Sequence, residues 1–119
     1  MEPQIRFCTS ADGTRIAYAT LGEGAPLVYV PPWPGNVELS WQRFECRALM
    51  ERLAQTRLFV TFDHRGVGAS QREVHDLSLE AQVADIGAVV DHLQLERFDL
   101  WGDVEGASMA VAYAAKHPK

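Results

Sequence analysis

Two glycines that stand four residues apart, Gly102 and Gly106, constrain the fold of this chain more than any other feature. A short apolar run with the character of a β-strand, residues 98–101, ends at the first glycine, and a segment rich in Ala and Met with the character of a helix follows the second. A strand that turns directly into a helix leaves no room for bulk on either side of the turn. The pattern therefore predicts a sharp strand-to-helix corner with Val104 at its tip.

The same spacing, Gly-x-Nu-x-Gly, is that of a nucleophile elbow. The middle residue of such an elbow must be Ser, Cys or Asp, because its side chain attacks a carbon atom. Here the middle residue is Val104, and neither Asp103 nor Glu105 has a glycine on both sides. The frame of a catalytic corner is present without its nucleophile. The simpler alternative is a tight turn of the kind found in any α/β sheet.

Apolar runs alternate with helical patterns along the rest of the chain. We expect strands at 5–9 and 15–20, joined as a hairpin around Asp12-Gly13, and at 27–30, 58–62 and 98–101. We expect helices at 38–55, from Ser78 as N-cap to about Leu93, and at 107–117. The apolar faces expected for the first two are Leu39, Phe44, Leu49, Met50 and Leu53, and Leu79, Val83, Ile86, Val89, Val90 and Leu93. This order predicts one α/β domain over 1–119, a three-layer α/β/α fold whose mostly parallel sheet has an N-terminal antiparallel hairpin.

Composition excludes several classes of function. The 119 residues are 47% hydrophobic, carry a net charge of −5 and contain no basic cluster, so we expect no nucleic acid and no membrane surface as partner. No apolar run approaches the roughly 20 residues of a membrane span. The N-terminus is polar, without a secretory signal, which favours a cytoplasmic location. Cys8 and Cys46 form no metal-binding motif, and we expect two reduced thiols, no metal and no cofactor.

Three motifs resemble the N-terminal half of the α/β-hydrolase fold family. Asp63-His64-Arg65-Gly66-Val67-Gly68-Ala69-Ser70 matches the family's Asp-x-Arg-Gly-x-Gly-x-Ser loop, and Gly102-Asp103-Val104-Glu105-Gly106 matches its elbow except at the nucleophile. Pro31-Pro32-Trp33-Pro34-Gly35 stands where the family often has His-Gly-aromatic-Pro. In detail the chain is similar to hydrolase-like domains that occur beside nucleotide-cyclase or transcription-regulator modules.

The resemblance implies roles for individual residues. The family's oxyanion hole would use the backbone N–H groups of Trp33 and Glu105, with the Asp103 and Glu105 carboxylates beside it. Those acids repel an anionic ligand, or else they stabilise the helix N-terminus. The loop residues Asp63, Arg65, Gly66, Gly68 and Ser70 are interpreted as structural, since the loop lacks the ending of a phosphate-binding P-loop. The family's catalytic acid and His follow the elbow, and we expect His64, His75, His92 and His117 to be surface residues instead.

These features predict a truncated, catalytically inactive hydrolase-like domain. Its last strand, 98–101, is expected to be an unprotected sheet edge through which the chain forms a homodimer. Two alternatives stay open. One is an ester hydrolase with an improvised site, built from His64 or His75 and a Ser across a dimer interface. The other is a sensor or interaction module that holds a small apolar ligand between Trp33, Trp101 and Val104.

Overall fold

The computed structural model describes residues 3–31, 36–103 and 105–117. They form five strands and four helices: β1 (Gln4–Thr9), β2 (Arg15–Leu21), β3 (Ala25–Val30), α1 (Val37–Gln42), α2 (Phe44–Ala54), β4 (Arg57–Phe62), α3 (Leu79–His92), β5 (Asp99–Gly102) and α4 (Glu105–Lys116). The sheet order is β1-β2-β4-β3-β5. The β1–β2 hairpin is antiparallel, β2 pairs antiparallel with β4, and β3 pairs parallel with both β4 and β5. The predicted fold class is confirmed.

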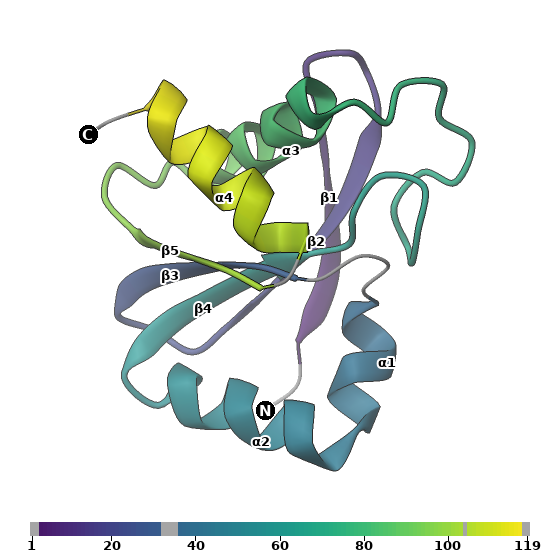
Figure 1. The fold of residues 1–119 in the computed structure, drawn as a ribbon. Helices are drawn as coiled ribbons and strands as arrows, with labels where there is room; N and C mark the ends of the chain where they lie inside the picture. Colours follow the sequence, from purple (N-terminus) through teal and green to yellow (C-terminus); the bar gives the residue numbers. More distant parts are fainter. Residues whose placement is uncertain (1–2, 32–35, 104, 118–119) are drawn as a thin grey trace.

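The sheet is covered on both faces, as its sequence pattern requires. Helices α3 and α4 lie over one face and α1 and α2 over the other (Figure 1). Successive residues of β3 pack against opposite helix layers: Leu27 packs with α1 and α2, while Val28 packs with α3 and α4. Side chains of a strand alternate between the faces of its sheet, so a continuously apolar strand can be buried on both sides.

The segment expected to be one helix over 38–55 is two helices. The chain is extended at Arg43 (φ −87°, ψ 125°), between α1 and α2. Trp41 and Met50 are nine residues apart, about half a turn out of phase in a straight helix. The break at Arg43 allows both side chains to be buried against the sheet.

Several residues expected on apolar helix faces are exposed. Leu39, Phe44 and Leu49 are between 47% and 82% exposed, and Leu79 at the start of α3 is 49% exposed. The remaining stripe of α3 is buried as predicted, apart from the half-buried Leu93. Its N-cap is also as predicted, because the Ser78 side chain accepts a hydrogen bond from the Ala81 N–H at 3.2 Å.

Both cysteines are free thiols. Cys8 is buried against α3, and this burial, together with the nearby Asp85 carboxylate, raises the pKa of its thiol to about 11. A thiol with so high a pKa is a poor nucleophile at neutral pH. Among the described residues, no group of three or more His, Cys, Asp or Glu could hold a metal ion, and no helix is long and apolar enough to cross a bilayer.

Candidate active site and its remnants

The strand-to-helix corner is built where the glycine pattern predicts it. Strand β5 ends at Gly102 and helix α4 begins at Glu105. A Cβ atom on Gly102 would lie 2.5 Å from the Gly106 carbonyl oxygen, and one on Gly106 would overlap the Val30 carbonyl oxygen. Neither glycine has a positive φ, so close approach of backbone, and not backbone conformation, requires glycine at both positions. Val104 and Trp33 lie outside the described residues, as does the Glu105 side chain.

Asp103 holds the corner to the neighbouring strand. Its N–H donates to the Val30 carbonyl at 3.1 Å, its own carbonyl accepts from the Gly106 N–H at 2.9 Å, and its carboxylate accepts from the Tyr29 hydroxyl at 3.1 Å. Burial and the Asp103 charge raise the pKa of Tyr29 well above its usual value. The phenol therefore stays protonated and acts as a hydrogen-bond donor to Asp103.

Trp101 lies on the face of the sheet that α1 and α2 cover. Its ring centroid is 4.7 Å from that of Tyr29, and the Tyr29 ring is in turn 6.0 Å from that of Phe59. The side chain is 36% exposed. Of the three residues proposed to enclose an apolar ligand, Trp101 is the one that the structure describes.

The loop from Asp63 to Ser70 is a hydrogen-bonded structural unit. The fully buried Asp63 carboxylate accepts from the Val37 N–H and the Ala69 N–H, both at 2.8 Å. Burial raises the pKa of Asp63, and the two amide donors oppose that rise. The Ser70 hydroxyl donates to the Asp63 carbonyl at 2.6 Å and accepts from the Ala17 N–H at 2.8 Å.

Both loop glycines have positive φ, Gly66 at 84° and Gly68 at 58°. At Gly68 a Cβ atom would also overlap the Asp63 carboxylate. The loop therefore closes tightly over the acid that anchors it.

Arg65 extends from this loop into a buried ion-pair cluster. Its guanidinium donates to both oxygens of Asp85, each at 2.8 Å, and to Asp12 at 2.8 and 3.2 Å. It also donates to the Asp76 carbonyl at 2.9 Å. The Arg65 and Asp85 side chains are almost completely buried, while the Asp12 side chain is 44% exposed. The Arg65 hydrogen bond is the main cause that lowers the pKa of Asp12 far below its usual value.

Sequence reasoning missed Asp85 and Asp12 as partners of Arg65. Asp85 lies within the apolar stripe of α3, four residues after the buried Ala81 and one before the buried Ile86. A buried carboxylate requires a cation or several hydrogen-bond donors as partners. The acidic residue on an apolar helix face was therefore the sequence signal that could have indicated such a partner.

His64 is not the surface residue that the sequence analysis expected. It is 1% exposed, its Nε2 lies 2.7 Å from the Pro31 carbonyl oxygen, and its ring packs edge-on against Phe62 at 5.3 Å. His64 follows the end of β4 at Phe62 by two residues, and its contacts with Phe62 and Pro31 bury it. His75, His92 and His117 are exposed, as expected.

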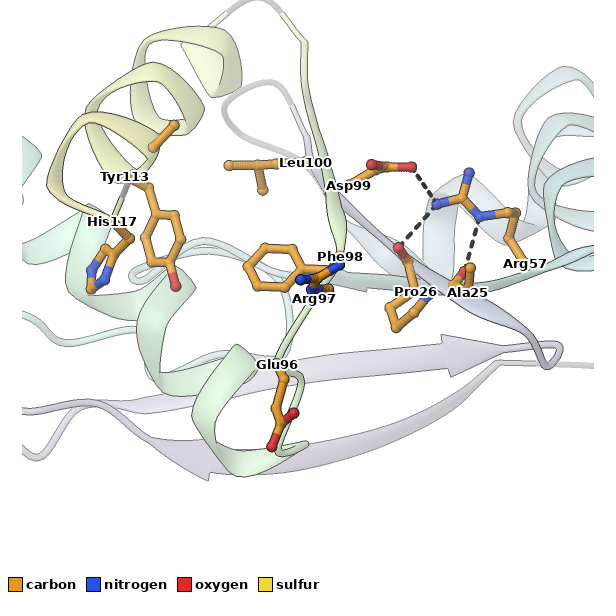
Figure 2. Close-up of a pocket in the computed structure, with 11 residues that line it drawn as sticks. Ala25, Pro26, Arg57, Glu96, Arg97, Phe98, Asp99, Leu100, Tyr113 and His117 are labelled. Carbon is orange, nitrogen blue, oxygen red and sulfur yellow. Dashed lines mark hydrogen bonds and ion pairs between the residues drawn. The ribbon is translucent and has the colours of Figure 1, made fainter. Parts of the chain in front are cut away.

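A separate groove of about 880 Å³ lies at the other end of β5 from the corner (Figure 2). Phe98, Leu100 and Tyr113 give it an apolar floor between β5 and α4. At its rim Arg57 forms a 2.7 Å ion pair with Asp99 and donates to the carbonyl groups of Ala25 and Pro26. Because Ala25 and Pro26 of β3 and Arg57 of β4 also line it, the groove lies where β3, β4 and β5 begin.

The corner, the Asp63–Ser70 loop and the sheet order together define the core of a hydrolase fold. Residues 25–119 match the alpha/beta hydrolase fold family. This chain belongs to that family.

Relatives that the chain resembles include both characterised enzymes and solved structures. It is 32% identical to the non-heme haloperoxidase of Rhodococcus erythropolis over 93% of this chain and 39% of that protein. An epoxide hydrolase from an endophytic Streptomyces superposes with a TM-score of 0.82 at 27% identity, covering 98% of this chain and 34% of the other. An esterase, RhEst1 from Rhodococcus sp. ECU1013, superposes with a TM-score of 0.81 at 27% identity, over 95% of this chain and 41% of the other. The chain thus spans about two fifths of the length of the relatives it matches.

Proposed function

We propose that this chain is a non-catalytic member of the alpha/beta hydrolase fold family that acts by binding, as a self-associating module. The observation that carries the proposal is the residue between the two corner glycines. That residue is Val104, whose isopropyl group has no lone pair with which to attack a carbonyl or an epoxide. The flanking glycines, Gly102 and Gly106, are packed closely against backbone atoms, which supports a corner of the family's type.

The hydroxyl and imidazole groups of the Asp63–Ser70 loop offer no replacement. The single proton of the Ser70 hydroxyl is directed to the Asp63 carbonyl, and the side chain is 3% exposed. Buried groups held in this way cannot reach a substrate. His64 is equally buried, and its Nε2 is occupied by the Pro31 carbonyl. An improvised site would therefore have to use exposed residues such as His75, in the loop between β4 and α3, and Ser108 of α4.

Introducing the missing hydroxyl, Val104→Ser, is expected to leave ester hydrolysis at the level of the buffer. A serine without a general base is protonated and weakly nucleophilic at neutral pH. The measurement is release of p-nitrophenol from a short acyl ester by the purified wild-type protein and the variant. Turnover by the wild-type protein that His75→Ala or Ser108→Ala removes would contradict the proposal and favour an improvised hydrolase site. A large gain in the Val104→Ser variant would reveal a general base within reach of the corner.

A second candidate, binding of a small apolar ligand, is favoured by the exposed indole of Trp101 beside Tyr29. A long-chain alcohol or fatty-acid ester that binds there is expected to raise the thermal midpoint, because it binds only the folded state. Trp101→Ala should abolish the rise, whereas Phe44→Ala, which removes another exposed aromatic residue on α2, should not. A rise that survives Trp101→Ala would place the ligand elsewhere. A role of this kind fits a domain beside a nucleotide-cyclase or transcription-regulator module.

A further inference from the structure

The carbonyl oxygen of Pro31 lies where the ends of three strands meet. Pro31 directly follows the end of β3, and it is buried. Its oxygen is 2.7 Å from the Nε2 atom of His64, which stands two residues after β4. The same oxygen lies 2.7 Å from the position that a Cβ atom on Gly106 would occupy. The Pro31 carbonyl therefore contacts both the imidazole after β4 and the corner that follows β5.

The contact with Pro31 fixes which nitrogen of the His64 imidazole carries a hydrogen. A carbonyl oxygen can only accept a hydrogen bond, so Nε2 is the donor. The distance between the two atoms, 2.7 Å, is at the short end of the ordinary range for such bonds. Because His64 is 1% exposed, water does not readily replace the imidazole as the donor to this carbonyl.

Further bonds join the end of β3 to the corner and to Trp101. The Val30 carbonyl accepts from the Asp103 N–H at 3.1 Å, and Val30 is paired with Gly102 in the parallel β3–β5 ladder. One residue earlier, Tyr29 is paired with Trp101, and its hydroxyl donates to Asp103. A shift of the end of β3 would therefore move the partners of Trp101 and of the corner together.

We propose that His64 is a positioning residue: by donating to Pro31 it holds the end of β3 in place, and with it the corner and Trp101. The neighbouring side chains of Asp63 and Arg65 bind α1 and α3, whereas the His64 side chain links the loop to the end of β3. This inference rests on the apolar-ligand site beside Trp101 in the proposed function, and it names the residue that keeps that site in shape.

The test compares two replacements of His64 by amide hydrogen exchange, measured with NMR. Glutamine carries a side-chain amide that can still donate to Pro31, whereas phenylalanine keeps a ring against Phe62 but has no donor. In His64→Phe we expect protection of the Asp103 N–H, which bonds to Val30, to fall at least about tenfold more than protection of the buried part of α3. In His64→Gln the two regions should change equally.

Two controls separate the local effect from a general loss of stability. The amides of Val89 and Val90, which are buried in α3, report the stability of the fold as a whole. His75→Phe makes the same substitution at an exposed position and should leave protection of Asp103 unchanged. Equal losses at Asp103 and in α3 of His64→Phe would overturn the proposal, because His64 would then only stabilise the fold. Equal results for the two replacements would also overturn it, because the imidazole would then act through packing.

Two further measurements keep the role of His64 distinct from the proposed ligand site. Imidazole ¹⁵N shifts of the wild-type protein need no variant, and an Nε2 atom without a hydrogen would overturn the proposal. The thermal rise caused by the long-chain alcohol should be lost in His64→Phe and kept in His64→Gln. A rise that His64→Phe retains would overturn the link to the ligand site. A wild-type protein that shows no rise would overturn that site alone, while hydrogen exchange still decides whether His64 positions the corner.

Discussion

Replacing Arg65 by methionine is expected to destabilise the protein by about 3–5 kcal/mol, the usual cost of removing one partner from a buried ion pair. The guanidinium is 1% exposed and donates to both oxygens of Asp85, which is just as deeply buried. Methionine fills much of the volume but leaves the Asp85 carboxylate buried without its cation. Urea denaturation followed by circular dichroism measures the loss, provided that the variant still folds.

Two controls make the Arg65 prediction specific. Asp12→Asn removes charge from the exposed side of the same cluster and is expected to cost no more than about 1 kcal/mol. The double substitution Arg65→Met with Asp85→Leu removes both buried charges, so it should recover much of the stability lost in the single variant. Equal losses in the single and double variants would show that the arginine acts through packing alone.

Gly106→Ala is expected to destabilise the fold by at least about 2 kcal/mol, because its added methyl group cannot be accommodated without moving backbone. The new Cβ would overlap the Val30 carbonyl oxygen and lie 2.7 Å from that of Pro31. Both neighbours are main-chain atoms, so no side chain can rotate away. The denaturation midpoint in urea is the appropriate measurement.

Gly87→Ala is the matched control for Gly106→Ala. Gly87 lies within α3, and the nearest atom to its added Cβ would be the Tyr113 ring at an ordinary 3.8 Å. Alanine has a higher helix propensity than glycine, so this variant should be more stable than the wild-type protein by up to about 1 kcal/mol. If Gly106→Ala were tolerated as well as Gly87→Ala, the corner would be looser than the structure shows.

The Arg65 cluster and the strand-to-helix corner are two parts of the family's fold that this chain has. The corner rests on close backbone packing at Gly102 and Gly106, and the loop rests on Asp63 and Arg65. These parts of the framework are present in this chain, and the proposed function assigns it a binding role.

The sequence by itself determined the order of strands and helices, the hairpin, the sheet type and the glycine corner. These depend on local properties: the periodicity of apolar residues, the Asp12-Gly13 turn, and the small size of Gly102 and Gly106.

Only the tertiary structure decided which distant groups meet. Asp12 and Asp85 are 53 and 20 residues from Arg65 in sequence, and no local pattern joins them. The break at Arg43 also depends on packing, because it lets Trp41 and Met50, which are out of phase in a straight helix, both be buried against the sheet. The burial of His64, just after β4, depends on packing in the same way. Local periodicity predicts that a side chain is apolar or polar on its own element, but the partner and the depth of burial depend on how the layers pack against one another.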